Sequence, residues 1–338
     1  MSTRVLIKNH QSPGDILMIT AAVRDLRAAH PNVRVNVQTT CPEFWENNPY
    51  LDLSISDRTP GVKIIQGEYK LIHKSGQLPY HFIHGFRKDL EKKLNLIIPP
   101  SGSTAAVFLK KEDTGPGPME ELGHVGPYWI INTGGKKDYT AKWWNPNHAQ
   151  AVIDHFKDRI MFVQAGGKGD DHWHPPLSGA MDMVGRTTLR GLMRLMWHSQ
   201  GVICPVTMMM HLSAAIPSKY GGIRPCIVTA GGREPASWEA YNGHFYLSKV
   251  GALPCSMNGP CWKGKATMVQ CKQEVDEKRS IGNICENKVE LDELIDGKPL
   301  QIAKCMDMTK PSHIISIIED LLETERIHEL QKSHISGS

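Results

Sequence analysis

Short apolar runs alternate along the chain with longer segments in which apolar residues recur every three or four positions. Residues 4–9 form the first run; a turn at 12–15 and a helical pattern over 16–30 follow. Residues 33–40 then alternate like a strand, and residues 81–96 have an amphipathic helical pattern. Strands separated by helices predict a mostly parallel sheet covered on both faces.

The same alternation restarts after a Gly- and Pro-rich stretch. We predict strands at 127–135, 159–167, 201–206 and 225–232, with helices between them and a last helix before a disordered tail. Three of these strands end in Thr-Gly-Gly or Ala-Gly-Gly, which places open turns at the carboxyl edge of the sheet, where α/β folds bind ligands. The pattern predicts an α/β protein with two Rossmann-like domains facing a cleft.

Changes in composition set the expected boundaries. The domains are expected at 1–110 and 127–250, joined by a linker at 111–126 and followed by a Cys-rich insertion at 251–308 and a helix at 309–330. A length of 338 residues suits two domains. The net charge of +4 is too small to indicate nucleic-acid binding. Without a signal sequence or a membrane span, we expect a cytoplasmic protein.

Cysteines cluster in the C-terminal part of the chain. Five of the eight occur between positions 255 and 305. In a reducing compartment, clustered thiols indicate metal binding more than disulfides, and four thiolates form a tetrahedral site for zinc, iron or an iron–sulfur cluster. The candidates are Cys255, Cys261, Cys285 and Cys305, with Cys271 as a fifth. The alternative is a set of unconnected reduced cysteines.

Two loops carry candidate chemistry. Asp15 follows the first strand and is either a helix cap or a general base at the mouth of a cleft. Thr133, Gly134 and Gly135 follow a strand, with Lys142 shortly after. Free amides, a hydroxyl and an ammonium group suit a diphosphate, although a solvated basic loop fits equally well.

Two further segments carry weaker signals. Gly185 and Thr187 precede a helix, where a capping role is the simpler interpretation. His211 lies on an otherwise apolar helix, so it is either a packing residue or a group that meets a phosphate or sugar.

These segments occur in one order: Ser12-x-Gly14-Asp15, Thr133-Gly134-Gly135 with Lys142-Trp143, Val184-Gly185-Arg186-Thr187-Thr188-Leu189, and Thr207-x3-His211. The ordered set resembles family 9 glycosyltransferases, the heptosyltransferase family, over nearly the whole chain. The segment 231–265 and the later KCMDM resemble the iron-binding autotransporter heptosyltransferase branch.

The resemblance implies a GT-B fold, with a final helix that crosses back to the first domain, and an inverting transfer of heptose from ADP-heptose. Asp15 then matches the general base and Lys142 the lysine on the donor diphosphate. Thr133, Gly134, Gly135, Gly185, Thr187, Thr207 and His211 match donor-binding positions. Val206 and Met208 stand where many members have Asp and Gly, so a carboxylate near the donor is missing.

Cofactors and partners follow from the same resemblance. Iron, with zinc as the alternative, is expected on Cys255, Cys261, Cys285 and Cys305, and no divalent cation is expected in catalysis. The expected partners are a nucleotide-sugar donor, an acceptor protein or glycan and, as an open option, further copies of the chain. Two alternatives remain: transfer to a hydroxylated DNA base, and a non-enzymatic metal–thiolate protein on a degenerate transferase fold.

Overall fold

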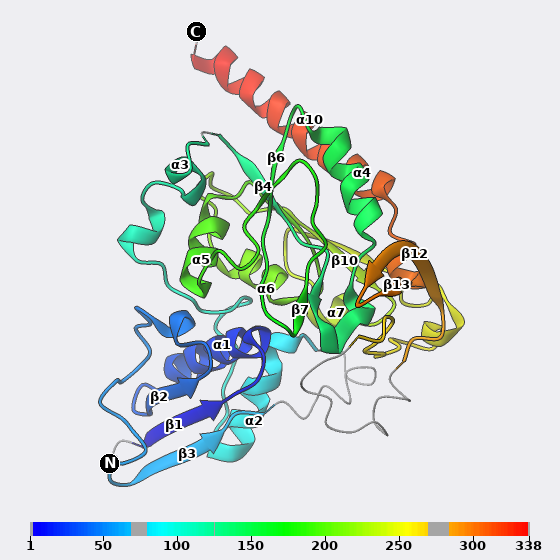
Figure 1. The fold of residues 1–338 in the computed structure, drawn as a ribbon. Coiled ribbons are helices and arrows are strands. Elements are labelled where there is room, and N and C mark those ends of the chain that lie inside the picture. Colours follow the sequence, from blue (N-terminus) through cyan, green and yellow to red (C-terminus); the bar gives the residue numbers. More distant parts are fainter. Residues whose placement is uncertain (1–2, 69–79, 125, 270–283, 337–338) are drawn as a thin grey trace.

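The computed structural model describes residues 3–68, 80–124, 126–269 and 284–336, which form two α/β domains (Figure 1). The N-terminal domain contains a parallel three-stranded sheet in the order β2-β1-β3. Its strands are β1 (Arg4–Asn9), β2 (Arg34–Thr39) and β3 (Val62–Gln66). The strands predicted at 4–9 and 33–40 are therefore confirmed.

Helix α1 (Pro13–Ala29) begins where the sequence predicts a turn. Ser12 is its N-cap and Pro13 occupies its first position, where a missing N–H costs nothing. The apolar residues from Ile16 to Leu26 are buried, and the helix packs against α2 (Gly85–Leu94), which continues the short turn η3 (Phe82–His84).

The second domain contains a parallel six-stranded sheet in the order β11-β10-β9-β4-β6-β8. The strands are β4 (Tyr128–Ile131), β6 (Met161–Gln164), β8 (Ala180–Asp182), β9 (Gly201–Pro205), β10 (Cys226–Gly231) and β11 (His244–Ser248). The central strands β4, β9 and β10 are buried throughout, as expected for a sheet with both faces covered. The two edge strands, β8 and β11, are short and were not predicted.

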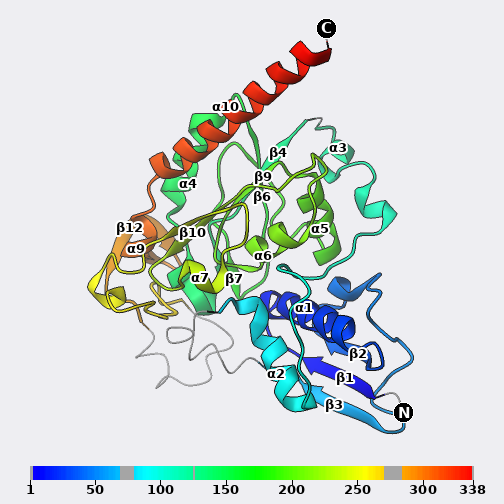
Figure 2. The same cartoon turned by 180° about the vertical axis from the view of Figure 1, so that it is seen from behind.

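Helices cover both faces of this sheet (Figures 1 and 2). On one face, α4 (Pro146–Phe156) packs with the C-terminal helix α10 (Pro311–Ser336). On the other face, α5 (Leu189–His198) and α6 (Met208–Ala215) lie toward the N-terminal domain. The linker contains the turn η4 (Lys111–Thr114) and the short helix α3 (Pro118–Glu121).

The Cys-rich insertion contains more regular structure than its sequence indicated. It begins with the turn η6 (Pro254–Ser256) and includes an antiparallel hairpin of β12 (Lys288–Ile295) and β13 (Lys298–Ala303), followed by α9 (Lys304–Asp307). The candidate ligand Cys271 lies outside the described residues.

The C-terminal helix corrects two expectations. It extends through Ser336, so most of the tail predicted to be disordered is helical. It also packs on α4 and points away from the N-terminal domain, so the predicted crossing back is wrong (Figure 1). Glu319 anchors it, accepting hydrogen bonds from Arg159 and pairing with His155 at 2.9 Å.

A search of the described helices finds none with both the length and the apolar character needed to cross a bilayer.

Candidate active site at the domain junction

The N-terminus of α1 in the first domain lies against the N-terminus of α6 in the second. A Cβ placed on Gly14 would lie 3.8 Å from the His211 ring and 3.8 Å from the Met208 backbone, at the start of α6. Asp15 follows Gly14, and its charge is one of those that raise the pKa of Glu239 in the second domain. The junction therefore brings Asp15 and His211 into one neighbourhood.

Asp15 takes part in the capping box of α1. Its Oδ2 accepts the Ser12 N–H at 3.1 Å, and the side chain is partly exposed. Ser12 is the N-cap, so Asp15 is not the N-cap itself but the third helical residue of a capping box. The hydrogen bond also fixes the carboxylate at the junction, so the two predicted roles are compatible, and the role of general base remains a prediction.

Lys142 forms an ion pair with a buried acidic residue. It ends the turn η5 (Lys137–Lys142), and its Nζ lies 2.9 Å from Oε1 of Glu234, which follows β10. The same ammonium donates to the Val206 carbonyl at 3.2 Å, at the end of β9. The Lys142 side chain is 23% exposed and that of Glu234 4%, so the lysine lies between the carboxylate and solvent.

Arg233 gives Glu234 a second cationic partner. Its Nη1 donates to Glu234 Oε1, its Nε donates to the Lys263 carbonyl at 2.8 Å, and the guanidinium lies over the Tyr139 ring at 5.1 Å. Burial by itself would raise the pKa of Glu234, but the charges of Arg233 and Lys142 outweigh burial and lower it. Glu234 is therefore an ionised carboxylate held by two cations.

Glu239, at the end of α7 (Ala236–Glu239), is a second buried carboxyl group with the opposite protonation state. Burial, followed by repulsion from Glu234, raises its pKa to about 8. Its Oε2 lies 3.7 Å from Nε2 of His211, whose Nδ1 lies 2.8 Å from the Tyr241 hydroxyl. Burial lowers the pKa of His211 well below its usual value, so the imidazole is neutral. The packing interpretation of His211 is supported.

Side chains of the N-terminal domain close this junction. His81 Nε2 donates to the Ala240 carbonyl at 3.0 Å, and the Phe82 ring stacks on Trp238 with centroids 5.6 Å apart. Burial lowers the pKa of His81 to about 4. The contact is therefore made by neutral and apolar groups.

The Thr-Gly-Gly loop has a structural constraint that the sequence did not indicate. A Cβ on Gly134 would lie 2.0 Å from the Trp173 carbonyl oxygen, because β5 (Gly135–Lys136) pairs with β7 (His172–Trp173) as a small antiparallel ribbon. Thr133 is fully buried, and its carbonyl accepts the Trp144 N–H at 2.9 Å. The ribbon explains the glycine at 134, and its role in donor binding remains a prediction.

The predicted hydroxyl residues act mainly as caps. Thr188 caps α5 by accepting the Gly191 N–H at 3.0 Å. The capping residue is therefore Thr188 and not the adjacent Thr187. Thr207 caps α6, accepting the Met209 N–H at 3.3 Å.

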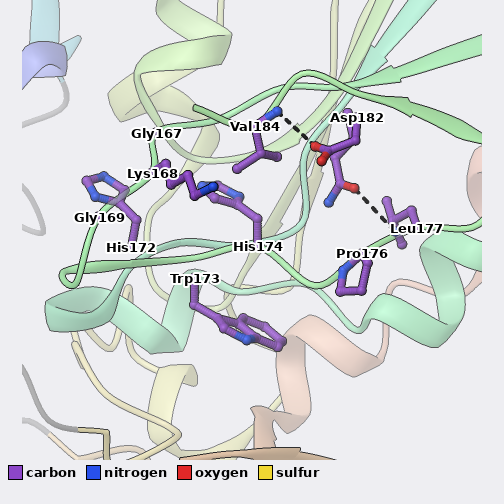
Figure 3. Close-up of a pocket in the computed structure, with 11 residues that line it drawn as sticks. Gly167, Lys168, Gly169, His172, Trp173, His174, Pro176, Leu177, Asp182 and Val184 are labelled. Atoms are coloured by element: carbon purple, nitrogen blue, oxygen red, sulfur yellow. Dashed lines mark hydrogen bonds between the residues drawn. The ribbon is translucent and has the colours of Figure 1, made fainter. Parts of the chain in front are cut away.

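A cavity of about 410 Å³ opens beside the ribbon, at the carboxyl ends of β6 and β8 (Figure 3). Its polar lining includes Lys168, His174 and Asp182, and Trp173 and Val184 contribute apolar surface. Gly185 lies at its edge with φ +68°, where a Cβ would meet the Lys168 side chain at 2.3 Å. We call this the lateral cavity; its volume is in the range of small-molecule sites.

The four predicted metal ligands lie near enough for their charges to affect one another. Burial, together with the charges of Cys305, Cys261 and Cys255, raises the pKa of Cys285 to about 11. Cys305 lies against Gly231, and the Cys261 N–H donates to the Gly232 carbonyl at 3.1 Å. Four soft sulfur donors fit an iron or zinc site chemically. Among the described residues, however, no three potential ligands are close enough to hold an ion, so the metal site remains a prediction.

Comparison with known proteins places this fold. No family model and no curated protein matches the sequence. Among solved structures, a family 9 glycosyl transferase from Veillonella parvula has a TM-score of 0.56 at 14% identity, over 73% of this chain and 87% of that one. E. coli ADP-heptose LPS heptosyltransferase II has 0.57 at 12% identity, over 96% and 100%.

A third similar structure is that of TibC, an iron-containing dodecameric glycosyltransferase from enterotoxigenic E. coli. Its TM-score is 0.58 at 16% identity, over 96% of this chain and 78% of TibC. The chain has the fold of the family 9 glycosyltransferases. The resemblance carried by the ordered motifs is confirmed at the level of the fold, including two parallel sheets in the GT-B arrangement.

Sequence reasoning missed the buried charges of this family 9 fold. Arg233 and Glu234 directly follow the Ala-Gly-Gly at the end of β10, and Glu239 comes one turn later. Charged residues right after a strand's open turn, at the edge where ligands bind, were a usable signal. Their burial, which depends on the insertion packing over them, was not visible in the pattern.

Proposed function

We propose that the protein is an inverting glycosyltransferase that moves a sugar, heptose in the favoured case, from an ADP-sugar to an acceptor hydroxyl. One observation carries the proposal: Asp15 and Lys142, from different domains, lie at one junction in a fold shared with heptosyltransferases. A TibC structure that holds ADP-D-β-D-heptose has a TM-score of 0.60 to this chain, at 14% identity, and supports that donor.

The proposed reaction needs one base and one cation. The acceptor oxygen attacks the anomeric carbon, the bond from that carbon to the diphosphate breaks, and the acceptor proton goes to the Asp15 carboxylate. The Lys142 ammonium stabilises the negative charge on the departing diphosphate. Thr133, Gly134, Gly135, Thr207 and His211 complete the proposed donor site.

The lateral cavity is the proposed place of the nucleoside. It lies on the same carboxyl edge as Lys142, and its volume of about 410 Å³ accommodates a nucleoside. Gly185 directly follows the lining residue Val184, and this place supports the donor-binding role proposed for it. The ribbon β5–β7 connects the cavity to the Thr-Gly-Gly loop, which would place a diphosphate between the two.

Asp15→Asn tests the proposed base. Asparagine can still accept the Ser12 N–H, so the helix cap survives, but the amide cannot take the acceptor proton. We expect ADP binding within about twofold of wild type and transfer reduced by about 10²-fold or more, measured by calorimetry and by release of ADP from ADP-heptose. Asp158→Asn, at an exposed position, is the matched control. Full turnover by Asp15→Asn would exclude this base.

We also propose that Cys255, Cys261, Cys285 and Cys305 hold iron, with zinc as the alternative. Thiolates in this position would fix the insertion to the end of β10, where Cys261 and Cys305 already contact Gly232 and Gly231. When bound, the metal would supply structural cross-linking next to the donor site. The similarity to iron-containing TibC supports iron.

Metal analysis of the purified protein tests this site. We expect about one metal ion per chain in the wild type and in the control Cys41→Ala, whose thiol is buried in the N-terminal domain. Cys285→Ser should lose most of the metal and lower the melting temperature. Equal metal content in the Cys285→Ser and wild-type proteins, or none in either, would refute the assignment.

A further inference from the structure

Two buried carboxyl groups beside Lys142 have oxygen atoms that no group in the described protein satisfies. Glu234 is 3% exposed and Glu239 5%. Oε2 of each is buried without a hydrogen-bond partner. A buried polar atom without a partner is unfavourable, so two such atoms on carboxyl groups whose charges repel each other indicate a site that a ligand completes.

The charge balance around the pair argues against a metal ion there. Lys142 and Arg233 both contact Glu234, so its negative charge is already compensated. Glu239 lies beside the neutral His211. A divalent cation would face two protein cations, whereas uncharged hydroxyl groups would meet no such repulsion.

The chemistry of the pair fits a polyhydroxylated ligand. Glu234 is an acceptor of hydrogen bonds. Glu239, protonated at neutral pH, offers a donor and an acceptor. Adjacent sugar hydroxyls both donate and accept, so they complement this combination. Position 206, at the end of β9, is a valine whose carbonyl is taken by Lys142, and it offers a sugar no side-chain acceptor.

Lys142 controls access to the pair. Its side chain is the partly exposed one, and its ammonium lies on Glu234 Oε1. A donor diphosphate would attract the ammonium toward itself and uncover the Glu234 oxygens for the sugar. The same lysine would thus couple diphosphate binding to sugar binding.

We propose that Glu234, together with Glu239, recognises the hydroxyl groups of the sugar that is transferred. This inference rests on the proposed function and deepens it, since it assigns the specificity of the donor site to residues after β10. Both are positioned by the fold: Glu234 by Arg233 and Lys142, Glu239 by the short helix α7.

The test compares two ligands on the same variants. Calorimetry gives the Kd of ADP and of ADP-heptose for wild type, Glu234→Gln, Glu239→Leu and the control Glu112→Gln, which is exposed in the linker. The readout is the ratio of the two constants, because loss of the partner of Lys142 alters diphosphate binding equally for both ligands. For Glu234→Gln we expect the affinity for ADP-heptose to fall about tenfold or more relative to the affinity for ADP.

The outcomes separate the two proposals. An unchanged ratio in Glu234→Gln and Glu239→Leu, with both ligands bound, overturns sugar recognition and leaves the transferase proposal standing. A wild-type protein that binds neither ligand overturns both. If Glu234→Gln does not fold, as judged by circular dichroism, Glu239→Leu carries the test, because leucine removes both the donor and the acceptor, with an expected loss of about threefold or more in the same ratio.

Discussion

At the residue scale, the molecule concentrates buried ionisable groups at one junction. Glu234 is ionised because two cations contact it, whereas Glu239, five residues later, is protonated because burial and repulsion from Glu234 raise its pKa. The sequence allowed Asp15, Lys142 and His211 to be predicted here, because short motifs carried them. It did not allow the glutamates to be predicted, because protonation state depends on burial by distant segments.

The raised pKa of Glu239 predicts a pH-dependent stability. Its pKa is about 8 in the folded protein and near 4.5 when unfolded. Between these values the folded state binds the additional proton, so this group's contribution to stability falls as pH rises through 8. Glu239→Gln removes that contribution, so its melting temperature relative to wild type should increase between pH 6.5 and 8.5. Parallel melting curves of the two proteins over this range would contradict the assigned protonation.

Histidines at the same junction have the opposite effect on the pH dependence of stability. Burial lowers the pKa of His81 and of His244 to about 4, below the usual value of 6.5. The unfolded state therefore binds more protons between pH 4 and 6.5, and stability rises with pH in that window. The comparison of Glu239→Gln with wild type avoids this effect, since both proteins keep the histidines.

At the scale of elements, the strongly periodic segments were predictable and the short ones were not. The central strands β4, β9 and β10 have continuous apolar runs, and α1 has a cap, a proline and an apolar face. The ribbon β5–β7 has two residues in each strand and depends on a glycine that allows close approach of Trp173. Such pairing arises from tertiary contact, so no local pattern predicts it.

The hairpin β12–β13 is a second element that the local sequence pattern did not predict. In β12 exposed and partly buried residues alternate and Ile295 alone is buried, whereas in β13 the buried residues are confined to its second half, so neither strand has a continuous apolar run. The charges of Cys255, Cys261 and Cys305 act on the Cys285 thiol, so these cysteines lie in one region, and the metal-binding insertion that they indicated stays a prediction.

At the scale of the whole molecule, the two domains share a hydrophobic core. One contiguous cluster of buried side chains runs from β1 and α1 through Phe82 to α5 and α6 of the second domain. A second cluster, on the far face of the large sheet, joins α4, β13 and α10. An apolar interface of this kind resists free domain motion. The two domains therefore touch at the junction, and moving them apart has to separate packed aromatic rings.

Phe82 offers a test of this coupling. Its ring is 6% exposed, stacks on Trp238 and packs near His211. Phe82→Ala should lower the free energy of unfolding by about 3–5 kcal/mol. Because the lost contacts join the two domains, calorimetric unfolding should change from one transition to two. Phe156→Ala, a fully buried phenylalanine of the second cluster, is the matched control. It should lower the transition temperature without separating the domains. A single transition in Phe82→Ala, with equal van't Hoff and calorimetric enthalpies, would show that contacts other than this ring join the two domains.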